Sequence, residues 1–122
     1  LLFALTLSLA GAAAHAADAP AEPVPPQPDP EEQLDEGLKR FGYLAGLTRG
    51  CVTDEQRPAL EKEALDLHAG IARLLGTDRA FLFGAAFGNG TGVTLELKEC
   101  EEVIAAYEQR VVDFRARQGG KP

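Results

Sequence analysis

The sequence predicts an all-α fold: a small bundle of three long helices and one short helix, held by one disulfide. Apolar residues recur at helical spacing in several segments after residue 30, and capping residues and glycines separate these segments. The two cysteines, Cys51 and Cys100, both lie in this helical part of the chain after residue 30. Val93–Leu97 alternates as a strand does but has no partner strand, so we interpret it as the approach to the last helix.

Residues 1–16 have the features of a cleaved signal peptide. The apolar run Leu1–Ala10 leads into Ala14-His15-Ala16, an A-x-A pattern, so we place cleavage after Ala16. A membrane span needs about 20 apolar residues, so we expect no stable membrane insertion after cleavage. Neither Met nor a basic residue precedes the run. We therefore expect that the signal is incomplete at its N-terminus, or that a non-standard start codon was read as Leu.

Residues 17–29 are expected to form a disordered, proline-rich spacer. Prolines recur at positions 20, 23, 25, 26 and 28, which excludes helix and sheet and favours extended polyproline II. The spacing Pro23-x-x-Pro26 also fits a ligand for an aromatic groove. Because such spacing arises easily in any proline-rich run, we favour a stiff spacer ahead of a helical domain at residues 30–118.

The first helix is predicted to begin at Pro30, with Asp29 as its cap, and to end near Gly50-Cys51. Its inner face carries large and small apolar residues at helical spacing: Leu34, Leu38, Phe41 and Ala45. Gly42, Gly46 and Gly50 recur every four residues and form a smooth strip. That strip predicts the close approach of another helix, rather than a membrane dimer, because charged residues interrupt it.

The second helix is predicted to begin with the capping signature Thr53–Gln56 and to stop at Gly76, in a left-handed conformation. Its stripe is Leu60, Ala64, Leu67, Ile71 and Leu74. The short third helix is expected from Thr77 to Phe87, with Gly88–Gly92 breaking all regular structure. The fourth is expected from about Leu95 to Arg117, with an inner face of Cys100, Val103, Tyr107, Val111 and Phe114. Residues 119–122 are expected to form a disordered tail.

The net charge of −7 argues against a nucleic-acid partner, because phosphate contacts need clustered Lys and Arg. It also argues against binding to an anionic membrane surface. The predicted signal peptide indicates a periplasmic or secreted protein, and two cysteines in an exported chain indicate a disulfide between Cys51 and Cys100. The partner we expect is another exported protein.

A search for catalytic chemistry gives mostly negative results. After Ala16 the chain has no serine, and His68 is its only histidine. There is no Cys-x-x-Cys, phosphate loop or dinucleotide fingerprint, so we expect no cofactor and no metal. A Cys–His nucleophilic pair of Cys51 or Cys100 with His68 would require a free thiol. A hydrolase with two catalytic carboxylates stays open by residue count alone.

The stretch Phe81–Gly92 has the most unusual composition, with three of the six phenylalanines. Phe81, Phe83, Phe87 and Asn89 are therefore candidate contacts for a partner or an apolar ligand. The alternative is that the rings fill the core. Because Phe81 and Phe83 stand two residues apart, they cannot share one helical face. Asn89-Gly90-Thr91 matches a glycosylation acceptor, but we interpret it as a turn.

These observations together favour an exported, non-enzymatic helical interaction domain, such as an adaptor, an inhibitor or a chaperone-like protein. A carrier of a small apolar ligand is the first alternative. A carboxylate-based hydrolase is the second.

Overall fold

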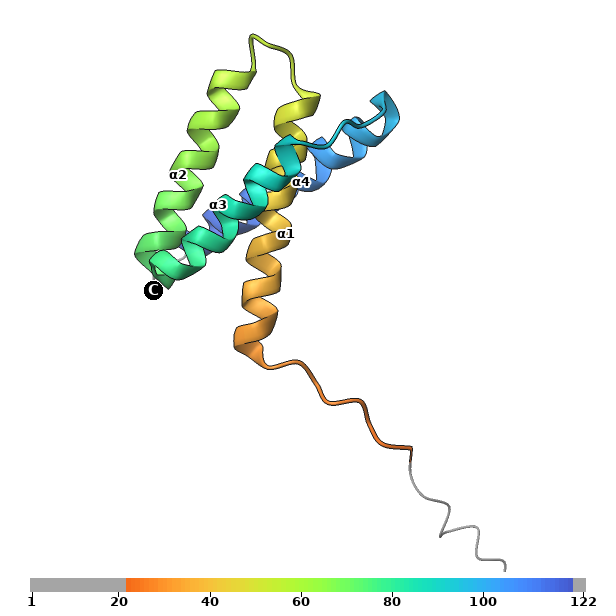
Figure 1. Cartoon of the computed structure of the whole chain (residues 1–122). Coiled ribbons are helices and arrows are strands. Elements are labelled where there is room, and N and C mark those ends of the chain that lie inside the picture. The colour runs from red at the N-terminus through yellow and green to blue at the C-terminus, as the bar shows by residue number, and fades with distance from the viewer. Residues whose placement is uncertain (1–21, 120–122) are drawn as a thin grey trace, which may run out of the picture.

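Four α-helices follow one another in the computed structural model, which describes residues 22–119 (Figure 1). They are α1 (Pro30–Cys51), α2 (Arg57–Leu75), α3 (Thr77–Thr91) and α4 (Leu97–Gly119). Within the described residues no strand forms, so the prediction of a four-helix, all-α fold is confirmed there. The predicted signal peptide lies outside the described residues. Of the predicted tail, Gly119 ends α4 and residues 120–122 lie outside them as well.

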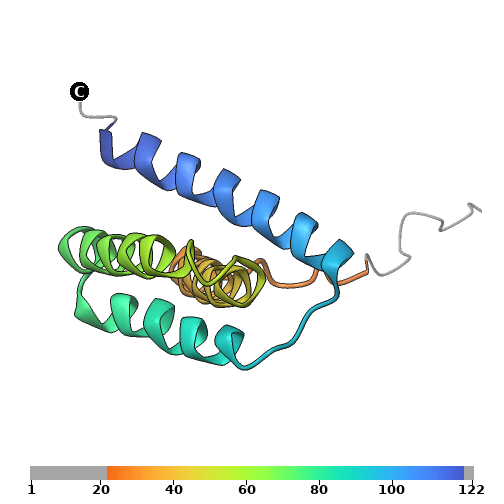
Figure 2. The same cartoon turned by 90° about the horizontal axis from the view of Figure 1, so that it is seen from above.

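The helices form three layers (Figure 2). Helices α1 and α2 make the middle layer, and α3 and α4 cover its two opposite sides. The two middle helices run antiparallel, as their short connection predicts. The main partner of α1, however, is α3, which packs along it closely.

Local sequence signals fix the helix starts. Asp29 caps α1 by accepting a 3.2 Å hydrogen bond from the Glu31 N–H, and Pro30 occupies the first turn. The predicted capping signature before α2 forms a separate turn. There the Thr53 N–H donates to Gln56 Oε1 at 3.2 Å and the Gln56 N–H donates to Thr53 Oγ1 at 3.3 Å, so α2 begins only at Arg57. Residues 22–29 form neither helix nor strand and are exposed.

Gly76 separates α2 from α3 with a positive φ of 96°, as expected of a glycine stop. Its ψ of 162° is extended, so the predicted left-handed helical cap is wrong in that detail.

The predicted break at Gly88–Gly92 is wrong, because α3 continues to Thr91. Glycine lowers helix stability by about 1 kcal/mol relative to Ala, which is why the sequence indicates an end here. Tertiary contact reverses that preference. Gly90 is buried against α1, where a Cβ atom would overlap the carbonyl oxygen of Tyr43. The interpretation of Asn89-Gly90-Thr91 as a turn is wrong for the same reason, and Asn89 has no positive φ.

The glycine strip of α1 receives α3, which confirms the prediction of a close helix approach. A Cβ atom on Gly42 would overlap the Phe83 carbonyl oxygen, and one on Gly46 would overlap that of Phe87. Gly50 has ordinary clearance from Val93. The strip therefore serves the interior of this bundle, and no helix among residues 22–119 is long and apolar enough to cross a membrane.

The core is built around Phe41 of α1. Its ring packs edge-on against Phe83 of α3 at 5.3 Å between centroids, and lies 6.2 Å from Tyr107 and 6.0 Å from Phe114 of α4. Most predicted inner-face residues are buried or half-buried. Leu74 is the exception: it stands in the last turn of α2, beside a groove, and is 57% exposed.

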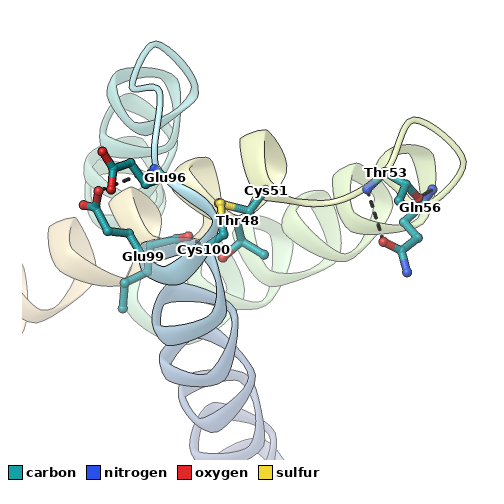
Figure 3. Close-up of a disulfide and its surroundings, with 8 residues drawn as sticks. Thr48, Cys51, Thr53, Gln56, Glu96, Glu99 and Cys100 are labelled. Atoms are coloured by element: carbon teal, nitrogen blue, oxygen red, sulfur yellow. Dashed lines mark hydrogen bonds between the residues drawn. A yellow bond between two sulfur atoms is a disulfide. The ribbon is translucent and has the colours of Figure 1, made fainter.

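The predicted disulfide joins Cys51 at the end of α1 to Cys100 in the first turns of α4 (Figure 3). It closes a sequence separation of 49 residues and brings the two Cα atoms to 5.4 Å. A polar contact ties α4 to α2 further along. The Tyr107 hydroxyl donates to Glu63 Oε1 at 2.7 Å, and Arg115 Nη2 donates to Glu63 Oε2 at 3.1 Å.

Candidate binding groove

The four residues selected from Phe81–Gly92 do not form one site. Phe83 is 1% exposed and belongs to the core, as one alternative predicted. Phe81 is 70% exposed, so the two rings point to different faces, as their spacing requires. Phe87 is half-buried and packs against the core, whereas Asn89 is exposed.

Two small pockets border this stretch. One, of about 240 Å³, lies between α2 and α3 and is lined by Glu61, Ala64, Leu65, His68, Phe83, Gly84 and Phe87. The other, of about 410 Å³, lies between α1 and α3 and is lined by Lys39, Arg40, Tyr43, Leu82, Ala85, Ala86 and Asn89. The first contains two of the selected phenylalanines and the second contains only the selected asparagine.

A hollow larger than these two lies elsewhere, where the first turns of α1 meet the last turns of α2 and α4. It has a volume of about 700 Å³, and we call it the bundle-end groove. Its lining residues are Pro30, Gln33, Leu34, Gly37, Leu38, Phe41, Leu74, Leu75, Arg110, Asp113, Phe114 and Arg117. These lining residues come from α1, α2 and α4, and none comes from α3.

Helical periodicity places these side chains together. On α1, Pro30, Leu34, Leu38 and Phe41 recur at intervals of three or four residues and so share one face. At a rise of 1.5 Å per residue, the wall from Pro30 to Phe41 is about 16 Å long. Gly37 adds no side chain to this wall, and nothing lies within 4 Å of the position a Cβ atom would take there.

The opposite wall, on α4, carries alternating charges. Arg110 and Arg117 stand seven residues apart, about 10 Å along the helix axis, with Asp113 between them. The Arg110 Nη1 donates a long hydrogen bond of 3.5 Å to the Gly37 carbonyl oxygen. The ion pairs among the described residues include neither Arg110 nor Arg117.

The bundle-end groove combines an apolar floor with two arginines at its edge. Arg115, which is also on α4, is instead paired with Glu63. Sequence reasoning missed the groove because arginines near the end of a helix already have a local explanation, a favourable interaction with the helix dipole. The spacing of Arg110, Phe114 and Arg117 on one face was the signal that pointed to it.

The structure also places the residues considered for catalysis. Both cysteines are in the disulfide, and no free cysteine exists among residues 22–119, so a Cys–His pair with His68 is excluded there. His68 lies beside Gly84 at the edge of the pocket between α2 and α3. Over the same residues, no group of three or more His, Cys, Asp or Glu side chains is placed to hold a metal ion.

Among the residues that the structure describes, Tyr107 is the ionisable group whose pKa is strongly shifted. Burial, the hydrogen bond to Glu63 and the charge of that carboxylate raise its pKa well above the usual value. A tyrosine held in its neutral form, with its hydroxyl committed to Glu63, is a structural contact between α4 and α2.

Comparison of the chain with protein-family models, with characterised proteins and with solved structures found no match.

Proposed function

We propose that this protein is an exported, non-enzymatic helical domain that binds another exported protein through the bundle-end groove. The observation that carries the proposal is the groove itself, which has a volume of about 700 Å³ and an apolar floor beside Arg110 and Arg117. Folding alone does not require such a surface, because a small domain gains stability by closing over its apolar residues. Leu74, at the groove, is left 57% exposed.

Export is supported by the predicted signal peptide at residues 1–16 and by the disulfide between Cys51 and Cys100. Disulfides persist in oxidising compartments and are rare in the cytosol. We therefore place the protein in the periplasm or outside the cell, with residues 17–29 as the spacer between its mature N-terminus and the helical domain. Fractionation, together with the N-terminal sequence of the mature protein, tests this part of the proposal: a mature chain beginning at Ala17 is expected.

The binding role is tested with two matched variants of α2. Leu74→Asp puts a charge in the groove, whereas Leu65→Asp puts the same charge on an exposed leucine of the pocket between α2 and α3, at 57% and 69% exposure. Each variant, produced with its disulfide intact, is used to capture proteins from native periplasmic extract. Leu74→Asp is expected to lose a partner that the original chain and Leu65→Asp both retain. Equal capture by all three proteins would contradict the proposal.

A carrier of a small apolar ligand is the second candidate, and the pocket between α2 and α3 favours it. Its lining is almost wholly apolar, with His68 at the edge. Its volume of about 240 Å³ lies below the roughly 300 Å³ of ordinary ligand sites, so it suits a molecule of one ring. Native mass spectrometry of protein from its own periplasm is expected to show a co-purifying small molecule if this candidate is right.

A further inference from the structure

One wall of the bundle-end groove is long enough to lie beside a short helix. Its α1 wall is about 16 Å long, which corresponds to about three helical turns. Leu38 and Phe41, which are 6% and 4% exposed, form the floor, and Leu34, Leu74 and Phe114 supply the more accessible apolar contacts. An amphipathic helix laid in a groove uses anchors at the same spacing, three or four residues apart.

The charges of the groove specify the flank of such a helix. Arg110, Asp113 and Arg117 present positive, negative and positive charge within about two turns of α4. The complementary flank carries an acidic residue, a basic residue and a second acidic residue at the same spacing. Arg110 and Arg117 have no ion-pair partner among the described residues, so a bound acidic side chain would not have to displace an existing one.

We propose that the partner inserts an amphipathic α-helix into the bundle-end groove, with two acidic side chains about two turns apart facing Arg110 and Arg117. This inference rests on the proposed function and names the chemistry of the partner. The apolar face of the helix covers the floor, and its acidic flank fixes the register.

The overall charge of −7 opposes an acidic partner at long range, and this determines the conditions of the test. At an ionic strength of 0.15 M, exposed charges are screened over about 8 Å. Contacts at the groove edge act at shorter distances and retain more of their strength. Binding is therefore measured at that ionic strength.

The probes are two synthetic helical peptides of the same length, each held helical by a staple on its solvent face. Both carry leucines at groove-facing positions. One has Glu, Lys and Glu on the flank, and the other has Lys, Glu and Lys, with a compensating residue on the solvent face to equalise net charge. Calorimetry with the disulfide-bonded protein is expected to give an affinity about tenfold higher for the first peptide, because attractive contacts replace repulsive ones.

A charge-reversed groove provides the decisive comparison. The variant R110E/R117E is expected to prefer the second peptide. The control R40E/R73E makes the same change in net charge at arginines outside the groove, and it is expected to keep the original preference. Circular dichroism checks that each variant folds. If R110E/R117E does not fold, the single substitution Arg117→Glu, at an exposed residue, replaces it.

The outcomes separate this inference from the proposed function. Equal binding of the two peptides, or binding of neither, overturns the acidic-helix inference. The proposed function still stands in that case if Leu74→Asp loses the native partner. One further result would overturn the inference: self-association that R110E/R117E abolishes. If neither peptide binds, saturable binding of decanoate that Leu74→Asp abolishes would identify an apolar ligand as the occupant instead.

Discussion

The carbonyl oxygen of Phe87 in α3 lies directly over Gly46 in α1, so closely that a Cβ atom on Gly46 would overlap it. The same hypothetical atom would lie 2.9 Å from the Cα atom of Gly90. Both neighbours are backbone atoms, so relief requires one helix to move. Backbone-to-backbone packing of α1 on α3 therefore depends on the absence of a side chain at position 46.

Gly46→Ala is expected to destabilise the protein even though Ala favours helix formation. The gain in helix propensity is about 1 kcal/mol, while overpacking of a closely packed contact costs about 1–3 kcal/mol or more. Because the overlap involves backbone, we expect the overpacking to dominate and the free energy of unfolding to fall. Urea denaturation followed by circular dichroism measures the change.

Gly88→Ala is the matched control in the same helix pair. Gly88 is helical and exposed, and nothing lies within 4 Å of its missing Cβ atom. We expect this variant to be more stable by about 0.5–1 kcal/mol. Loss of stability at position 88, or a gain at position 46, would show that the helices do not pack as described.

The two phenylalanines at positions 81 and 83 are expected to respond very differently to truncation. Phe83→Ala leaves a cavity beside Phe41, and large-to-small changes of buried aromatic residues cost about 3–5 kcal/mol. Phe81 is 70% exposed, so Phe81→Ala should change stability by no more than about 0.5 kcal/mol. Thermal unfolding of the two variants gives the comparison. Similar losses of stability would contradict the assignment of Phe83 to the core and of Phe81 to the surface.

Most of the fold is predictable from periodicity and caps. The apolar stripes identify four helices, and Asp29 with Pro30 fixes the start of the first. Glycine misleads where tertiary contact decides: a local rule ends the third helix at Gly88, but burial of Gly90 against α1 extends it to Thr91. The smooth strip of α1 predicts a partner helix, but no property of that strip alone identifies α3 as this partner.

The candidate groove is less predictable than the fold. Composition directs attention to Phe81–Gly92, whereas the bundle-end groove combines residues from three helices that are far apart in sequence. Arg110 and Arg117 match the dipole at the end of α4, and this local explanation conceals their position beside Leu34 and Phe41. Only the packing of α1 against α4 brings these residues together.

Tyr107→Phe is expected to lower stability at neutral pH by about 1.5–3 kcal/mol, because the Tyr107 hydroxyl donates to the Glu63 carboxylate. The ring stays in place beside Phe41, so the change isolates the hydrogen bond. The free energy of unfolding from urea titration at pH 7 measures it. An unchanged value would mean that the contact between α4 and α2 does not depend on this hydroxyl.

The same tyrosine predicts a loss of stability in alkali. Its pKa is raised above the ordinary value of 10.0 in the folded protein by burial and by Glu63. Above pH 10 the unfolded chain releases the Tyr107 proton while the folded protein keeps it, so the free energy of unfolding falls as pH rises. The deficit of Tyr107→Phe relative to the original protein should therefore shrink between about pH 10 and 11.5. Tyr43→Phe, which changes the other tyrosine, should leave the alkaline loss in place.

Removal of the disulfide is expected to cost about 4 kcal/mol, the loop entropy of a closed segment of about 50 residues. The exposed Leu97 at the start of α4 does little to hold that end of the helix, so Cys100 is its main tie to α1. In C51A/C100A we therefore expect the first turns of α4 to exchange their amide hydrogens fastest, while the turns around Tyr107 stay protected by Phe41 and Glu63. Hydrogen exchange measured by mass spectrometry resolves the two ends. Uniform exchange along α4 would mean that the disulfide stabilises the bundle as a whole rather than this end of the helix.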